Sequence, residues 1–316
     1  MGRRQGQSFM QRTSGLNTVL DPERLQQGDR TNGYEIELAE AVNVSIDNRG
    51  LPSLRNGSSP VAAGEYHSLF CGGGDCFAIL EGESSASVVK IHTDFTTSVV
   101  RSGLSKGLRM GFAQTNTDTF YSNGVQNGFI RGGINYPWPV QTYRGPDADV
   151  DFSTSVPVAN HLSFLQGGKC VLSVGPYLFL NHEPFKYGLF APALGFIGFE
   201  SDVSMICPAK SGFFVSDQRQ TWFFRKVDGG WYRYRQELVD TAPAIEWSLA
   251  QEKVLLRDIG YDLPGFGRVW RSTEGVCVGT DDGLVFNKTK DKVRLPIGYS
   301  RGACLIKDYT VISTVA

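Results

Sequence analysis

One segment of the chain matches, by residue type and spacing, the turn that carries the nucleophile of many serine hydrolases. Gly103, Ser105 and Gly107 fit the pattern G-x-S-x-G, in which a strained turn between a strand and a helix exposes the serine oxygen. Here a second strand-like run follows the pattern, and no helix is predicted after it. We therefore interpret residues 103–107 as an ordinary turn.

A second segment, Asp281-Asp282-Gly283, places two carboxylates side by side. A calcium loop needs further acidic residues at fixed spacing and a final glutamate, whereas the residues after Gly283 are apolar. An Asp-Gly pair between two apolar runs is typical of a hairpin turn, which is the structure that we predict.

Paired carboxylates about 5–10 Å apart can hydrolyse glycosidic bonds. Four acidic residues lie at the ends of strand-like runs in different parts of the chain, and a closed β-fold could bring them to one face: Asp75, Glu81, Asp217 and Asp281. Their separation does not follow from the sequence, so a hydrolase stays an alternative. No other enzyme motif is present, and we predict that the chain is not an enzyme.

Aromatic and basic residues alternate over 222–226 and 231–235, on either side of the turn Asp228–Gly230. Such runs can stack on sugars or bases if they are exposed. They also suit the two faces of an antiparallel hairpin, and this structural interpretation is the one we favour.

The thiols and imidazoles show no metal-binding spacing. The six cysteines are scattered without a C-x-x-C pair, and the four histidines lie far apart, so we predict no metal site and no cofactor. Most cysteines fall in apolar runs, and we expect Cys170, Cys207, Cys277 and Cys304 to be buried free thiols. Cys71 and Cys76 flank a Gly-rich turn and could also close a short disulfide.

The composition favours strands over helices. The 316 residues include 37 Gly, 20 Phe and 12 Tyr but only 4 Met, and Gly with aromatic residues favours tight turns and strands. A net charge of −1 excludes a strong overall attraction to nucleic acid or anionic membranes. The apolar runs are too short and too interrupted for a membrane-spanning helix.

From residue 67 onward, alternating runs of four to six residues are separated by turn residues every 8–12 positions, a pattern typical of an all-β sandwich, barrel or propeller. Only Ala244–Asp258 has the spacing of an amphipathic helix.

A repeated phrase separates these architectures. A small or polar residue followed by apolar residues recurs with starts spaced by 43, 51, 43 and 63 residues, at Asp75, Asp118, Lys169, Gly212 and Gly275. A period of about 40–50 residues is that of a four-stranded propeller blade. We predict an antiparallel β-propeller of five to six blades, closed by pairing of Ala41–Ile46 with Thr310–Val315.

The first 33 residues differ from the rest. They carry five arginines and few apolar residues, which predicts an extended N-terminal arm over 1–33 and a propeller body over 34–316. Because arginine binds carboxylates through two parallel hydrogen bonds, we expect partner binding by Arg3, Arg4, Arg12, Arg24 and Arg30.

The segments 15–25 and 39–57 resemble the opening of structural proteins of tailed bacteriophages and prophages. Those openings combine a Pro-Glu-Arg turn, here Pro22–Arg24, with A-x-N-V-x-I-D, here Ala41–Asp47, and R-x-G, here Arg55–Gly57. The phrases at 67–70, 110–112, 120–124 and 275–283 are similar to that group as well. In this chain Leu51–Leu54 replaces the basic run that usually precedes R-x-G.

The resemblance implies a virion structural protein, located in the tail and assembled in the host cytoplasm. In short-tailed phages it implies a nozzle-like homo-oligomeric ring that extends the portal and adaptor channel, with adaptor, portal-side ring and fibres as partners and transient contact with the genomic DNA. The alternative is a tail-tip or host-glycan-binding propeller at the host surface, with a propeller hydrolase less favoured.

Overall fold

The computed structural model describes residues 12–16, 35–38, 44–46, 52–54, 60–139, 156–190, 195–227, 234–240, 242–290, 302–307 and 310–315. The chain divides into two compact units. The smaller unit comprises Met1–Pro60, Glu274–Val276 and Asn287–Ile297, and the larger unit comprises Val61–Thr273, Cys277–Phe286 and Gly298–Ala316.

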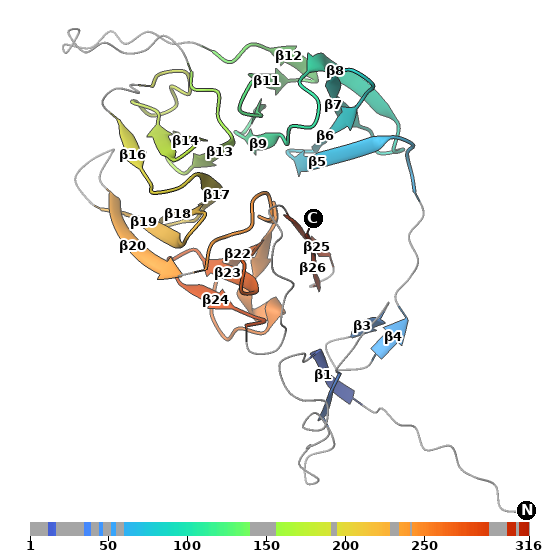
Figure 1. The fold of residues 1–316 in the computed structure, drawn as a ribbon, viewed down its shortest axis with the longest axis vertical. Coiled ribbons are helices and arrows are strands. Elements are labelled where there is room, and N and C mark those ends of the chain that lie inside the picture. The colour runs from blue at the N-terminus through green and yellow to red at the C-terminus, as the bar shows by residue number, and fades with distance from the viewer. Residues whose placement is uncertain are drawn as a thin grey trace, which may run out of the picture. The chain divides into compact units, whose positions relative to one another are not determined.

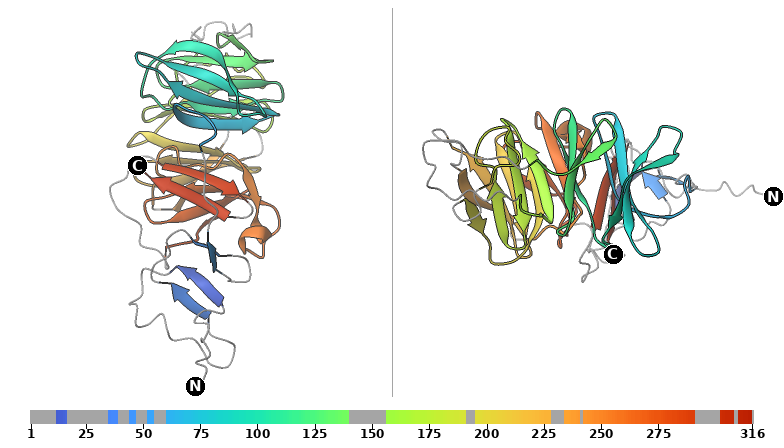
Figure 2. Two further views of the ribbon diagram at one scale, coloured as in Figure 1. Left: turned by 90° about the vertical axis from the view of Figure 1, so that its right-hand side faces the viewer. Right: turned by 90° about the horizontal axis from the view of Figure 1, so that it is seen from above.

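Five four-stranded sheets follow one another along the chain, and neighbouring strands within each sheet are consecutive in sequence. Figure 1 and Figure 2 show them succeeding one another in the larger unit. This is the arrangement of a β-propeller in which each sheet is one blade. The predicted all-β fold with five to six blades is therefore confirmed.

The strands of the first three sheets have the following bounds. The first sheet consists of β5 (Glu65–Gly72), β6 (Asp75–Glu81), β7 (Ala86–Ile91) and β8 (Thr97–Leu104). The second consists of β9 (Gly111–Gln114), β10 (Asp118–Ser122), β11 (Asn127–Arg131) and β12 (Ile134–Tyr136). The third consists of β13 (His161–Leu165), β14 (Lys169–Val174), β15 (Tyr177–Leu180) and β16 (Phe196–Gly198).

Two further sheets and three strand pairs complete the described structure. The fourth sheet consists of β17 (Val203–Pro208), β18 (Gly212–Asp217), β19 (Thr221–Lys226) and β20 (Tyr234–Asp240), and the fifth of β21 (Lys253–Leu255), β22 (Phe266–Arg271), β23 (Val276–Thr280) and β24 (Val285–Asn287). The pairs are β1 (Arg12–Leu16) with β2 (Glu35–Leu38), β3 (Val44–Ile46) with β4 (Pro52–Leu54), and β25 (Gly302–Lys307) with β26 (Thr310–Val315).

The apolar core is divided into clusters that lie between consecutive sheets. One cluster joins the first and second sheets through residues such as Phe77 and Tyr121, and the next joins the second and third through Phe120 and Leu172. Two more join the third sheet to the fourth and the fourth sheet to the fifth. Each sheet thus gains its stability by burying side chains against its neighbours.

The alternation of strand side chains explains why adjacent residues serve different clusters. In β18, Phe213 and Val215 pack toward the third sheet, whereas Phe214 packs toward the fifth. In β10, Phe120 and Tyr121 divide in the same way between two clusters. A middle strand with both faces covered needs apolar residues at successive positions, and all six residues of β18 are buried.

The repeated phrase marks the second strand in four of the sheets, at the starts of β6, β10, β14 and β18. In the fifth sheet the second strand is β22, which begins at Phe266, and the phrase at Gly275 falls on the third strand. The interval of 63 residues therefore does not measure one blade. The extra length reflects the long connection from β20 to β22.

That connection contains the one segment for which a helix was predicted, and the prediction of an α-helix over Ala244–Asp258 is wrong. The segment contains β21 and a short 3-10 helix, Leu256–Ile259. The backbone N–H groups of Ile245 and Ala250 donate to the carbonyls of Arg271 and Val269 in β22. Pairing with a neighbouring strand thus replaces the hydrogen bonds that a helix would have made.

The predicted closure by Ala41–Ile46 and Thr310–Val315 is also wrong. Thr310–Val315 pairs with the preceding strand, Gly302–Lys307, and Val44–Ile46 pairs with Pro52–Leu54. Hairpins between neighbours require the closure of only a short loop, which costs less chain entropy than pairing of distant segments.

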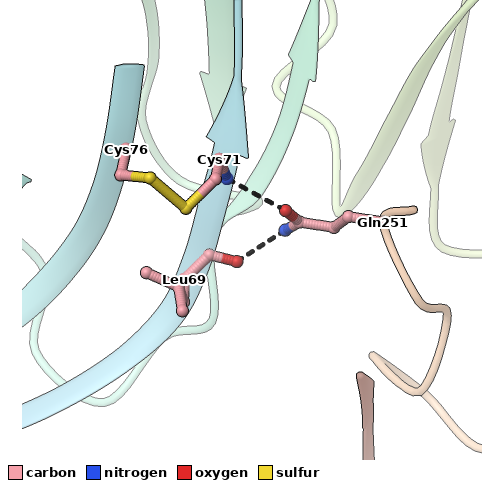
Figure 3. Close-up of a disulfide and its surroundings, with 4 residues drawn as sticks. All are labelled: Leu69, Cys71, Cys76 and Gln251. Carbon is pink, nitrogen blue, oxygen red and sulfur yellow. Dashed lines mark hydrogen bonds between the residues drawn. A yellow bond between two sulfur atoms is a disulfide. The ribbon is translucent and has the colours of Figure 1, made fainter. Parts of the chain in front are cut away.

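Hydrogen bonds from Gln251, which precedes β21, connect the fifth sheet with the first. Its side-chain Oε1 accepts the backbone N–H of Cys71 at 3.1 Å, and its Nε2 donates to the carbonyl of Leu69 at 2.5 Å. Figure 3 shows this amide reaching the strand β5, beside the disulfide of Cys71 with Cys76.

Candidate functional site

The arginines predicted to bind a partner lie outside the described residues. This holds for Arg3, Arg4, Arg24 and Arg30, and Arg12 contributes only its backbone as the first residue of β1. The strand β1 pairs in parallel with Glu35–Leu38, so the arm is joined to residues beyond its predicted boundary at position 33. Partner binding by these arginines and the boundary itself stay predictions.

Both short motifs form turns. Ser105 lies just after the end of β8, where its N–H donates to the side chain of Gln126, and Gly103 and Gly107 adopt the positive φ angles of 72° and 75°. In the second motif, Gly283 has a φ of 91° and its N–H donates to the carbonyl of Thr280. The predicted turn and hairpin are confirmed.

The four acidic residues that could have formed a hydrolytic pair each have partners in their own part of the fold. Asp75 forms an ion pair with Lys90 at 2.6 Å, and Asp281 lies 3.6 Å from the amine of Lys253. Such cross-strand and turn contacts stabilise the sheet edges and leave no pair of these carboxylates facing a common space.

The other two of these acidic residues, Glu81 and Asp217, hold turns in place. Glu81 Oε1 accepts a hydrogen bond from the N–H of Gly107 and lies 2.8 Å from Nε2 of His67. The opposite ring nitrogen of His67 lies 2.9 Å from the hydroxyl of Ser68, which also accepts the N–H of Met110. These contacts fix the connection between the first two sheets, and we assign them a structural role.

The aromatic residues of 222–226 are largely internal. Phe223 and Phe224 in β19 are buried in the clusters on either side of the fourth sheet, and Arg225 forms an ion pair with Glu237 of the neighbouring strand β20. The structural interpretation of this run as a hairpin strand is confirmed. Residues 231–233 of the second run lie outside the described residues.

The cysteines divide into two groups. Cys71 and Cys76 form a disulfide across the β5–β6 hairpin, so these two thiols are not free. Cys170, Cys207 and Cys277 are buried and unpaired, as predicted, and burial raises the pKa of Cys207 to about 12. The side chain of Cys304 lies outside the described residues.

A polar cavity of about 390 Å³ is the site with the clearest capacity to hold a ligand. Its walls come from the third, fourth and fifth sheets, at the ends where each first strand begins and each second strand turns into the third. It is lined by Asn160, Gly175, Asp202, Val203, Ser204, Gln218, Pro243, Ala244, Ile245, Glu246 and Thr273.

Hydrogen bonds hold the walls of this cavity in place. The carbonyl of Gly175, at a turn with a φ of 53°, accepts the N–H of Val203. The N–H of Thr273 donates to the carbonyl of Pro243. Asp217 holds the turn that carries Gln218 by accepting two backbone N–H groups at 2.9 and 2.8 Å. The cavity is therefore preformed.

Glu246 connects the cavity with a buried histidine. Its Oε1 lies 3.4 Å from Nε2 of His161, which has no hydrogen-bond partner. The ring of His161 packs against Trp247 with centroids 4.4 Å apart. Trp247 adopts a φ of 64°, a left-handed conformation that is costly for a bulky residue and often accompanies functional sites.

Within the described ranges, no group of three or more His, Cys, Asp or Glu side chains is placed to hold a metal ion. A helix with the length and apolarity to cross a membrane is not found among the described residues either.

Comparison with known proteins gives structural similarity only. No protein-family model matches the sequence, and the search of curated proteins found no match. A protein from Lactobacillus plantarum is similar with a TM-score of 0.47 at 10% identity, over 78% of each chain. A chain from Bacteroides uniformis with the provisional name 6-phosphogluconolactonase gives a TM-score of 0.42 at 10% identity, over 79% of this chain and 77% of that one. A gluconolactonase from Xanthomonas campestris gives 0.41 at 11% identity, over 72% and 74%.

These matches overturn the prediction that the chain is not an enzyme, because chains named as lactonases are among them. That prediction rested on the absence of local motifs. A propeller site is assembled from separate blades, so the lack of a local motif does not exclude activity. With TM-scores below 0.5, the matches assign no activity to this chain.

Sequence reasoning missed the acidic residues of the cavity, Asp202 and Glu246. They come from connections that precede β17 and β21, and 44 positions separate them. The available signal was their place in the blade period, because both lie shortly before the first strand of a blade.

Proposed function

We propose that this chain is a structural protein of a bacteriophage or prophage virion, with its propeller forming part of the tail. The observation that carries the proposal is the resemblance of residues 15–25 and 39–57 to the opening of such proteins, followed in one chain by the phrases at 120–124 and 275–283. The propeller body agrees with the fold which that resemblance implied.

The downstream phrases support the resemblance because they lie where the fold demands particular residues. In the phrase that ends at Gly124, the side chain of Asn123 accepts the N–H groups of Val125 and Gln126, and Gly124 adopts a φ of 83°. The phrase 275–283 contains β23 and its hairpin turn. A shared fold would retain residues at such turns.

Within the tail, the proposed place is a nozzle-like ring of identical copies that extends the portal and adaptor channel for genome passage. Rings of this kind repeat one head-to-tail contact between subunits. The arm arginines would bind carboxylates of an adjacent subunit or tail protein. A tail-tip position at the host surface is the alternative, and assembly in the host cytoplasm applies to both.

Electron microscopy of virions that carry a tagged copy of this chain tests the proposal. We expect the tag in the tail, next to the portal for a nozzle and at the far end for a tip protein. Virions that lack the chain, or that carry it in the capsid, would overturn it. Portal, adaptor or tail genes next to its gene would give independent support.

Substitutions in the arm test the proposed docking separately. Replacing the five arm arginines with glutamine should leave the melting of the isolated protein unchanged but prevent incorporation into tails. The matched control replaces them with lysine, which keeps the charge but lacks the paired donors of arginine. Normal assembly of the glutamine variant would show that these arginines do not dock.

A further inference from the structure

The cavity between the third, fourth and fifth sheets has a lining that differs from the rest of the blade ends. It presents two carboxylates, two amides and two hydroxyl groups, and no lysine, arginine or histidine is among its lining residues. The field inside is therefore negative, which disfavours phosphates, carboxylates and other anionic ligands.

Several of these polar groups are available to a ligand. Within the described part of the chain, the side chains of Asp202, Gln218 and Thr273 make no hydrogen bond or ion pair, and the only such contact of Glu246 is with His161 at 3.4 Å. Their hydrogen-bonding capacity is met by water in the free protein, and a ligand with matching groups can replace that water.

The kinds of groups present indicate the chemistry of the ligand. Carboxylates only accept hydrogen bonds, amides both donate and accept, and the Thr273 hydroxyl does both as well. An ammonium ligand would use only the acceptors. A ligand with several hydroxyl groups would use donors and acceptors together.

The remaining walls are apolar and suit the carbon skeleton of such a ligand. Val203, Pro243, Ala244 and Ile245 line the cavity beside the polar groups, and their positions are fixed, since the N–H of Ile245 donates to the carbonyl of Arg271 at 2.8 Å. Mostly apolar walls with a few fixed polar groups are typical of small-molecule sites, and the volume of about 390 Å³ lies in their usual range of roughly 300–1,000 Å³.

We propose that this cavity binds a neutral, polyhydroxylated ligand of the size of a sugar residue, with Asp202 and Glu246 accepting hydrogen bonds from its hydroxyl groups and Gln218 and Thr273 contributing further ones. This inference goes beyond the proposed place in the tail and does not depend on it. A failure to bind sugars would leave tail assembly untouched, and a failure of the tail proposal would leave the cavity in place.

Titration calorimetry of the full chain with glucose, galactose and N-acetylglucosamine tests the proposal, with gluconate as an anionic and glucosamine as a cationic probe. We expect saturable binding of at least one neutral sugar and none of gluconate. Asp202→Asn and Glu246→Gln should each weaken binding roughly 10- to 100-fold, the effect of losing a hydrogen bond to a charged group.

Two further variants separate a binding defect from a folding defect. Asp202, Gln218 and Thr273 are exposed, so Gln218→Ala and Thr273→Val should leave the thermal unfolding unchanged while weakening binding. Glu252→Gln is the matched control, because Glu252 is an exposed acidic residue that does not line the cavity, and its affinity should equal that of the wild type. No saturable binding of a neutral sugar, binding of glucosamine alone, or equal binding by the cavity variants would each overturn the proposal.

Discussion

Gln251 and Cys71 are 180 positions apart, yet the side-chain amide of Gln251 accepts the backbone N–H of Cys71 and, through its nitrogen, donates to the carbonyl of Leu69. One side chain thereby completes two backbone hydrogen bonds on β5 that no neighbouring strand supplies. The fifth sheet is thus connected with the first by polar contacts, whereas consecutive sheets are joined by buried apolar clusters.

Gln251→Ala should therefore weaken the connection between the first and fifth sheets. We expect a loss of about 1–2 kcal/mol in the free energy of unfolding, since two exposed hydrogen bonds are removed. Hydrogen exchange of the Cys71 amide should become faster, while amides in β18 should keep their protection. Unchanged exchange at Cys71 would show that this contact does not hold the sheets together.

Replacement of both cysteines of the β5–β6 hairpin, Cys71→Ser with Cys76→Ser, should cost about 2 kcal/mol, because the disulfide restricts a short loop in the unfolded chain. Urea unfolding with and without a reductant measures this cost. The reductant should lower the stability of the wild type by the same amount and leave the double variant unaffected. A reductant effect on the double variant would point to another oxidised pair.

The ion pair of Asp118 with Arg131 should make stability depend on pH in the acidic range. Two hydrogen bonds from the Arg131 guanidinium, at 2.7 and 2.6 Å, hold the pKa of Asp118 below its usual value. The stability that this carboxylate contributes is present above the pKa of the unfolded chain, about 3.9, and is lost as the pH falls toward the lower folded pKa.

Asp118→Asn should accordingly be less stable than the wild type at pH 7, by about 1 kcal/mol given the exposure of Arg131. The difference should narrow as the pH falls below about 4. Urea unfolding of both proteins from pH 7 to pH 2.5 measures it, and a constant difference over that range would contradict the assignment.

Lys169 should have the opposite kind of effect, in the alkaline range. Its amine is buried between the third and fourth sheets, 2.8 Å from the hydroxyl of Tyr234, and burial together with Lys226 lowers its pKa to about 8. The unfolded chain holds this proton up to a pH of about 10.4, so stability rises between about pH 8 and pH 10.

Lys169→Met should remove that rise and should stabilise the protein at pH 7 by on the order of 2 kcal/mol. Lys226→Met is the control, because Lys226 is exposed and its own charge costs little. A wild type whose stability is flat from pH 8 to pH 10 would contradict the lowered pKa of Lys169.

The sequence predicted those features that local alternation and turn residues determine. Runs such as Phe213–Val215 are buried on both faces, and Gly283 adopts the backbone that an Asp-Gly turn requires. The segment 244–258 was mispredicted because its helical spacing competes with backbone pairing to Val269 and Arg271, which lie in a strand that follows it in sequence. Local periodicity contains no information about that competition.

The candidate site was less predictable for a related reason. Asp202, Glu246 and Thr273 meet because three sheets end at one place, and no spacing along the chain encodes their meeting. The candidate acids Asp75 and Asp281 were chosen for their position beside turns, and those turns use them as structural partners.

The alternation of Phe213, Phe214 and Val215 between two clusters has a consequence for how such a chain tolerates change. A substitution within β18 alters one contact on one side. A single-residue deletion there would exchange every following side chain between the two sides of the sheet, so each neighbouring sheet would meet residues shaped for the other. Length is therefore under stricter constraint than residue type in the middle strands, and lineages of this fold should accumulate insertions in the connections between blades.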